Sequence, residues 1–283
     1  MSLASALLKR LFISKTLGIP WKDVRFGRRK DPTHGKPCAL LLDGTPAPIE
    51  FNVSHQAGLV VLVGCKGTDI ELGVDIVCVN ERNDYRLIDS EGFDGWVDVY
   101  QEIFSQEESW DMKYNVDPFK LLDGTEVTPE NLGRYDRCCS RGLTLVATLA
   151  NGEKRRFPSD LLIDAKLRRF YTYWCFKEAY IKLDGEALLA NWIKELEFRS
   201  VRAPNAGTVP RCSTLGSWGE RVGDCEVWMH HRKLDDVKIE IQAFEEDFMI
   251  GVAAKPTKDV PEVLTAFESL HLEEDVMAFA RSA

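Results

Sequence analysis

The sequence lacks several features that mark common protein classes. No apolar run approaches the length of a membrane span, and none forms the uninterrupted apolar core of a secretory signal near the start. The eight cysteines include no Cys-x-x-Cys pair, and the histidines have no ligand-like spacing, which argues against zinc. Basic residues are outnumbered, with 36 Lys and Arg against 45 Asp and Glu. The resulting net charge of −9 predicts a soluble cytoplasmic protein that binds neither a membrane nor nucleic acid.

Residues 1–21, MSLASALLKRLFISKTLGIPW, have the apolar spacing of an amphipathic helix with basic residues in its middle. The scarcity of acidic residues before Asp23 is also typical of a mitochondrial presequence, which is the alternative interpretation. The loop that follows, residues 25–37, carries five basic residues among glycine and proline. It is either a solvated surface or a local site for an anion.

The middle of the chain predicts both strands and helices. Three short β-branched segments predict antiparallel strands at residues 49–55, 59–65 and 70–79. Residues 96–112 have helical spacing and predict one helix, or a helix broken near Ser105. A long helix at about residues 160–184 then precedes four more strand candidates, which are residues 193–201, 225–231, 237–244 and 248–255.

A helix followed by antiparallel strands therefore occurs twice, which predicts an α+β fold of two similarly built lobes, residues 1–115 and 160–255. Residues 116–159 between them contain many turn residues and one apolar run, and are interpreted as an insertion or linker. Residues 256–283 predict an acidic, helical tail. Because loop-closure entropy rises slowly with length, replacing residues 123–155 by a short linker is expected to be mild.

The long helix contains FYTYWCFKEAYIKLDGEALL, residues 170–189, in which apolar side chains point in nearly every direction. Such a helix is enclosed by protein, and the charges of Lys177, Glu178 and Lys182 within it need partners. An ordinary pair of Glu178 and Lys182 at i, i+4 is the simplest explanation. That pair leaves the charge of Lys177 unexplained.

Two further stretches carry candidate functional groups. Asp75 lies in the apolar strand segment LGVDIV and either caps a turn or serves a ligand. Ser54 and His55 end an earlier strand and invite a hydrolase interpretation. However, adjacent strand residues face opposite sides, and no Gly-x-Ser-x-Gly motif is present. His55 is either a phosphate or substrate contact or a histidine satisfied within a turn.

Five motifs follow one another along the chain: GKP (35–37), FNVSH (51–55), GVDIV (73–77), FSQEE (104–108) and WCFKEAYIK (174–182). Together they resemble the 4′-phosphopantetheinyl transferases of the Sfp type, and the closest likeness is to fungal members of broad specificity. The resemblance implies this family's pseudo-twofold α+β fold, in which two lobes with antiparallel sheets meet at a coenzyme A cleft. It also implies holo-acyl-carrier-protein synthase activity, the transfer of the 4′-phosphopantetheine arm of coenzyme A to a carrier-protein serine.

The same resemblance implies roles for individual residues. Asp75 and Glu178 match the family's ligands for Mg²⁺, a cation that prefers hard carboxylate oxygens. Glu108 matches a further acidic position, a candidate metal ligand and, like Glu178, a candidate general base. Lys182 matches a lysine that stabilises the pyrophosphate of coenzyme A and can donate a proton to the leaving phosphate. Contacts to coenzyme A are implied for Lys36, Ser54 and His55.

The sequence also departs from the family pattern. Many bacterial relatives carry a second acid where this chain has Val77, so water or another side chain would complete the metal shell there. The chain begins inside a region that relatives extend with basic residues for the adenosine end. A noncatalytic relative that still binds carrier proteins is therefore one alternative, and a hydrolase using Ser54 is the other. The expected partners are coenzyme A and apo acyl, peptidyl or aminoacyl carrier domains, with the protein acting as a monomer.

Overall fold

The computed structural model describes residues 2–29, 35–80, 84–138, 140–185, 190–207, 216–262 and 264–282. Helices and strands are interspersed along it, and the α+β class with antiparallel sheets is confirmed. The elements are α1 (Ser2–Leu17), β1 (Arg25–Arg28), β2 (Pro37–Leu40), β3 (Ile49–Gln56), β4 (Leu59–Lys66), β5 (Glu71–Cys78), α2 (Tyr85–Asp98), α3 (Gln106–Tyr114), β6 (Phe119–Lys120), β7 (Glu126–Val127), β8 (Thr144–Thr148), β9 (Lys154–Pro158), α4 (Ser159–Asp184), β10 (Leu196–Arg199), β11 (Trp218–Val222), β12 (Glu226–Met229), β13 (Arg232–Lys233), β14 (Lys238–Phe244), β15 (Phe248–Lys255) and α5 (Ala278–Ser282).

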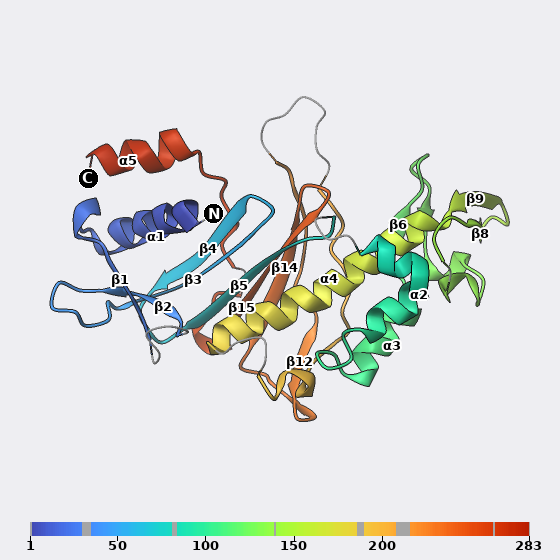
Figure 1. The fold of residues 1–283 in the computed structure, drawn as a ribbon, viewed down its shortest axis with the longest axis horizontal. Helices are drawn as coiled ribbons and strands as arrows, with labels where there is room; N and C mark the ends of the chain where they lie inside the picture. The colour runs from blue at the N-terminus through green and yellow to red at the C-terminus, as the bar shows by residue number, and fades with distance from the viewer. Residues whose placement is uncertain are drawn as a thin grey trace.

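The main sheet has the strand order β11-β14-β15-β5, and all its neighbours are antiparallel. Its edge strand β5 comes from the first half of the chain and pairs with β15 along its whole length, so that Asp75 lies opposite Gly251. The first two predicted strands form the separate hairpin β3–β4, which Figure 1 shows beside the main sheet. Strands from both halves of the chain share the main sheet, so the division into two lobes stays a prediction.

The long predicted helix is α4, and most of its side chains are buried. Figure 1 shows it crossing β5 and β15 and continuing to α2, α3 and the small strands β6, β8 and β9. Two glycines permit the close crossing. A Cβ atom at Gly73 would lie 2.0 Å from the carbonyl oxygen of Ala179, and one at Gly251 would lie 2.8 Å from the sulfur of Cys175. The helix therefore lies directly on the strand that carries Asp75.

We expect Gly73→Ala to lower the free energy of unfolding by about 1–3 kcal/mol or more, because the new methyl group meets helix backbone that cannot rotate away. Urea unfolding followed by tryptophan fluorescence measures the loss. Gly251→Ala is the matched control, since its methyl group meets the sulfur atom at the end of the Cys175 side chain. Equal losses in the two variants would contradict a specific helix-to-strand contact at Gly73.

The described part of residues 116–159 contains two hairpins, β6–β7 and β8–β9, with short turns between them. Alternate residues of β8 are buried. The segment supplies seven apolar side chains to the main core: Val116, Leu121, Val127, Leu132, Leu145, Ala147 and Phe157. The run GLTLVATLA (142–150) contributes Leu145 and Ala147 to the core, so we now expect that removal of the segment is not mild.

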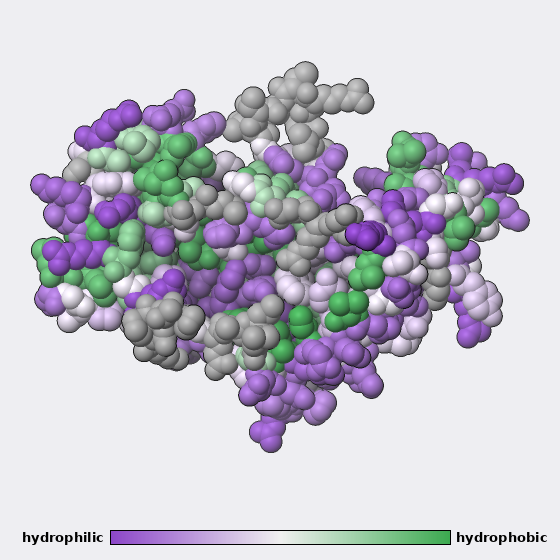
Figure 2. All heavy atoms as spheres, viewed as in Figure 1, coloured by the Kyte–Doolittle hydropathy of each residue, from purple (hydrophilic) through white to green (hydrophobic). Residues whose placement is uncertain are grey.

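The two ends of the chain lie together. Helix α1 packs on the β3–β4 hairpin through a second apolar cluster that includes Ile13 and Phe51. The tail returns to it through Phe279, whose ring centroid is 6.4 Å from that of Trp21, and Figure 1 shows α5 beside α1. In the part of the chain that the structure describes, no helix is both long and apolar enough to cross a membrane. The face in Figure 2 is mostly hydrophilic, with hydrophobic residues in separate patches.

Candidate functional site

Asp75, Ser54 and Lys182 form a hydrogen-bonded group where β3, β5 and α4 meet. The Lys182 Nζ lies 2.5 Å from Asp75 Oδ1 and donates to Ser54 Oγ at 2.7 Å. The Ser54 hydroxyl donates to the same Asp75 oxygen at 2.9 Å. Asp75 and Ser54 are both 6% exposed, whereas the Lys182 side chain is 28% exposed. The group therefore reaches the protein surface through the lysine.

The environment of Asp75 favours a neighbouring positive charge. Burial raises the pKa of its carboxyl, while Lys182 and the hydrogen bond from Ser54 oppose that rise. The carboxylate is thus shielded from water and held by one ammonium and one hydroxyl group. A cation at this position stabilises the ionised form of Asp75.

Glu178 lies one turn before Lys182 on α4 and is half-buried. Cys175 lies three residues before Glu178 on the same helix. Its Sγ donates to the Asp75 carbonyl oxygen at 3.6 Å. Burial, the charge of Asp75 and the charge of Glu178 all raise the pKa of the Cys175 thiol well above its ordinary value. The charges of Asp75 and Glu178 thus both act on Cys175, and the part of Glu178 in the site stays a prediction.

Lys36 lies at the C-terminal end of α4, where its Nζ donates to the Leu183 carbonyl oxygen at 3.4 Å. The same Nζ is 2.5 Å from Oε1 of Glu50, a residue only 2% exposed that also pairs with Arg29 at 2.7 Å. Glu50 orients both cations and offsets their charge. We did not predict a role for Glu50 from the sequence. Its spacing from Asn52 and Ser54, two and four residues later in β3, could have indicated one, because alternate strand residues share a face.

His55 is exposed, on the opposite side of β3 from Ser54. This arrangement follows from the alternation of side chains along a strand. The Ser54 hydroxyl is engaged with Asp75 and Lys182 rather than with the imidazole. The hydrolase interpretation therefore has no serine–histidine contact to support it.

Glu108 forms an enclosed ion pair elsewhere. Its Oε2 lies 2.9 Å from Lys177 Nζ and accepts from Ser105 N at 3.0 Å, and its Oε1 accepts from Phe198 N at 2.9 Å. Glu108 is 2% exposed and Lys177 is 1% exposed. Burial raises the pKa of the Glu108 carboxyl and lowers that of the Lys177 ammonium, while each charge opposes the shift of the other. This pair explains the charge of Lys177 inside the apolar helix.

The position of Glu108 differs from the one that its motif implies. Both of its oxygens accept bonds from α4, β10 and the start of α3, and none of its described contacts is to Asp75 or Lys182. Ser105 and Glu108 form the capping box of α3, at the helix break that the sequence predicts near Ser105. The pattern Ser-x-x-Glu is the usual signature of a capping box and could have indicated this structural role.

We expect Glu108→Gln to lower the free energy of unfolding by about 3–5 kcal/mol, because Lys177 would remain buried without its ion-pair partner. Thermal and urea unfolding measure the loss. Glu107→Gln is the control, since the side chain of Glu107 is exposed on the same helix. A Glu108→Gln variant of unchanged stability with no catalytic activity would instead support the implied role as a base or metal ligand.

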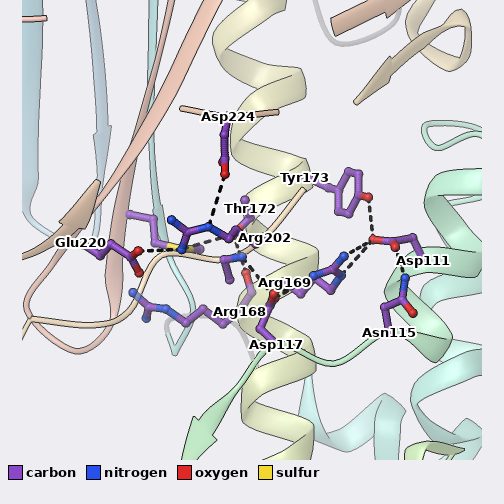
Figure 3. A network of polar contacts seen from close by, with 12 residues as sticks. Asp111, Asn115, Asp117, Arg168, Arg169, Thr172, Tyr173, Arg202, Glu220 and Asp224 are labelled. Carbon is purple, nitrogen blue, oxygen red and sulfur yellow. Dashed lines mark hydrogen bonds and ion pairs between the residues drawn. The ribbon is translucent and has the colours of Figure 1, made fainter. Parts of the chain in front are cut away.

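A second polar network holds the first half of α4 in place (Figure 3). The Arg169 guanidinium lies 2.5 Å from Asp111 and 2.8 Å from Asp117. The Tyr173 hydroxyl donates to Asp111 at 2.7 Å, and Asp117 also accepts from the Ala203 N–H at 3.2 Å. These bonds join α3, the chain after α3, α4 and the chain after β10. The network is structural, since its carboxylates are all occupied by bonds within the protein.

The residues of the site fit a magnesium ion better than a metal that needs many protein ligands. Within the described ranges, no three or more His, Cys, Asp and Glu side chains form a group that could hold a metal ion by themselves. Asp75 and Glu178 would thus be the protein's share of a coordination shell. Mg²⁺ is bound through one or two carboxylates together with water and phosphate oxygens. The buried Asp75 carboxylate, already beside a cation, agrees with such a site.

The site thus combines a buried carboxylate, a serine and a lysine at a helix–sheet contact of an α+β protein. Residues 1–67 match the family model described as 4′-phosphopantetheinyl transferase, N-terminal. The chain is 60% identical over 285 residues to a 4′-phosphopantetheinyl transferase of Aureobasidium melanogenum, a match that covers 99% of this chain and 84% of the relative. It is 34% identical to 4′-phosphopantetheinyl transferase A of Aspergillus fumigatus, over 90% of this chain and 71% of the relative. It is also 34% identical to 4′-phosphopantetheinyl transferase NpgA of Emericella nidulans, over 90% of this chain and 70% of the relative. The chain belongs to the 4′-phosphopantetheinyl transferase family, and its resemblance to fungal members is confirmed.

Proposed function

We propose that the protein transfers the 4′-phosphopantetheine arm of coenzyme A to a serine of apo acyl, peptidyl or aminoacyl carrier domains. The observation that carries this proposal is the contact of Asp75, Ser54 and Lys182, which come from three separate motifs. In the reaction, the serine oxygen forms a bond to the β-phosphorus of coenzyme A. The pyrophosphate bond breaks, and 3′,5′-adenosine bisphosphate leaves.

The carboxylates and the lysine have complementary tasks in this proposal. Asp75 and Glu178 would hold Mg²⁺, which would neutralise charge on the pyrophosphate oxygens. Lys182 turns its partly exposed ammonium from Asp75 to the pyrophosphate and can protonate the leaving phosphate. Lys36, Ser54 and His55 supply further contacts to coenzyme A. Val77 is 1% exposed within the main core and has no oxygen to offer a metal, so water or another side chain would complete that part of the shell.

We assign the role of general base, the group that accepts the proton of the carrier serine, to Glu178 rather than to Glu108. A general base must come within hydrogen-bond reach of the proton that it accepts. Glu178 is half-buried beside the proposed metal site, whereas Glu108 is enclosed with Lys177 and the backbone N–H groups. Glu108 then serves the reaction only through the packing of α3, α4 and β10.

Incubation of the purified protein with coenzyme A, magnesium chloride and a panel of apo carrier domains tests the proposed function. Mass spectrometry should show the gain of one phosphopantetheine arm on the carrier serine, and chelation of the metal should stop the gain. Carrier domains that bind the folded protein without any gain in mass would instead support the noncatalytic alternative.

A further inference from the structure

Strand β3 turns three polar side chains, Glu50, Asn52 and Ser54, toward the end of α4. They alternate along the strand and so share one face. They are 2%, 3% and 6% exposed, which is unusual for a row of polar residues and requires that their groups be bonded. Glu50 holds Lys36, and Ser54 lies between Lys182 and Asp75. The middle residue, Asn52, has no role assigned so far.

The Asn52 side chain joins the backbones of the two segments that carry the site. Its Nδ2 donates to the carbonyl oxygen of Lys182 at 3.2 Å. Its Oδ1 accepts from the N–H of Val74, the residue before Asp75, at 3.4 Å. Asp75 and Lys182 are separated by 107 positions in the sequence, so their contact depends on how the two segments are held together. Asn52 bonds directly to both segments.

We infer that Asn52 is a positioning residue of the transfer reaction: its amide sets the separation of Asp75 and Lys182 through their backbones. This inference rests on the proposed function. An amide side chain suits the task because it offers a donor and an acceptor at once, whereas an ionised carboxylate only accepts and a methyl group does neither. Lys182 has a long flexible side chain, so the placement of its backbone decides which positions its ammonium can reach. Small displacements of reacting groups have large effects on rate.

The test uses Asn52→Ala and the isosteric Asn52→Asp, with Ile163→Val as a control. Asn52→Asp keeps an acceptor for Val74 and loses the donor to Lys182, so it should behave like Asn52→Ala. Ile163 is a fully buried residue near the start of α4, and its truncation lowers stability without touching the site. In both Asn52 variants we expect kcat to fall by about 10- to 100-fold per folded molecule, with a much smaller change in KM for coenzyme A. The control should keep the kcat of the original protein.

A second measurement does not depend on catalysis. Lysine acylation by a small activated ester, followed by peptide mass spectrometry, reports how firmly the Lys182 ammonium is held by Asp75 and Ser54. Labelling of Lys182 should become about five-fold faster in Asn52→Ala. Loss of one hydrogen bond can raise by about that factor the population of molecules whose Lys182 ammonium is not held by Asp75 and Ser54. Labelling of the exposed Lys258 should not change in any variant.

The two measurements separate this inference from the proposed function. If Lys182 labelling in Asn52→Ala equals that of the original protein, or rises equally in Ile163→Val, Asn52 does not position the pair. A kcat in Asn52→Ala within two-fold of the original, with transfer established, overturns the inference in the same way. If no carrier domain is modified while labelling still rises only in the Asn52 variants, the proposed function fails and the positioning of Lys182 by Asn52 stands.

Discussion

Replacing residues 123–155 by a short Gly/Ser linker should leave the protein unable to fold cooperatively. The deletion removes Val127, Leu132, Leu145 and Ala147 from the main core. Burial of a large apolar side chain contributes about 1.5–3 kcal/mol, so the loss is roughly 5–10 kcal/mol. That loss is comparable to the whole free energy of unfolding of an ordinary domain, about 5–15 kcal/mol. Urea titration followed by circular dichroism should show a broad transition, or none.

Polar contacts of the same segment add to this expected loss. The buried ammonium of Lys166 donates to the carbonyl oxygen of Arg137, and the hydroxyl of Ser159 donates to that of Ser140 at 2.7 Å. Both acceptors lie in the deleted stretch, so both donors would lose a partner near the start of α4. Unsatisfied buried donors cost about 1–3 kcal/mol each.

Point substitutions in β8 separate the packing of this segment from its mere presence. Leu145→Ala should destabilise the protein by about 2–5 kcal/mol, because Leu145 is 8% exposed and lies in the main core. Val146→Ala, on the exposed face of the same strand, should change stability by no more than about 0.5 kcal/mol. A deletion variant with the urea midpoint of the original protein would show that the two hairpins are dispensable.

Periodic patterns in the sequence predicted the elements that local residues determine. The helix expected at residues 160–184 is α4, Ser159–Asp184, since its apolar run is long enough to distinguish a helix from a strand. The alternating segment at 237–244 is β14, and the helix break expected near Ser105 is present. These features depend on neighbours a few positions away, and so the sequence contains the necessary information.

The hairpins at 119–158 were not predicted. Strands β6 and β7 have only two residues each, too few for a periodic signal, and the five-residue strands β8 and β9 lie among many turn residues. Turn residues could have indicated them. Asp123-Gly124 and Asn151-Gly152 each lie between short strands, and such pairs are strong hairpin signals because their glycine readily adopts a positive φ. The pairing of β5 with β15 is a different case. It joins positions far apart in the sequence, and neither strand contains a local feature that selects the other.

The candidate site shows the same limit. The motifs predict roles for Asp75, Glu178 and Lys182, and the structure pairs Asp75 with Lys182, whereas the role of Glu178 stays a prediction. The motif containing Glu108 has the same form, yet the side chain lies in the enclosed pair with Lys177. A motif specifies residue types at fixed spacing, whereas a functional role depends on which oxygen remains accessible after the chain has folded. Burial and hydrogen bonding make that distinction here.

The charge of Asp75 is the feature on which the proposed function depends most. Burial opposes ionisation of this carboxyl and raises its pKa, while Lys182 and Ser54 favour ionisation. Burial thus disfavours the ionised form of Asp75, and a further adjacent cation would favour it. Removal of that charge should affect catalysis far more than folding.

We expect Asp75→Asn to reduce phosphopantetheine transfer by roughly 10³-fold, since a bound metal ion supplies several kcal/mol of charge stabilisation in such reactions. The asparagine can still accept the hydrogen bond from Ser54, and Lys182 can turn to solvent, so the free energy of unfolding should change by no more than about 1 kcal/mol. Transfer assays and thermal unfolding of the same preparation measure the two effects. Asp98→Asn is the matched control, because Asp98 also pairs with a lysine, Lys113, at 2.5 Å, and its side chain is 59% exposed. If Asp75→Asn transfers at the rate of the control at saturating Mg²⁺, Asp75 is not a metal ligand, and the charge at this helix–strand contact has only a structural role.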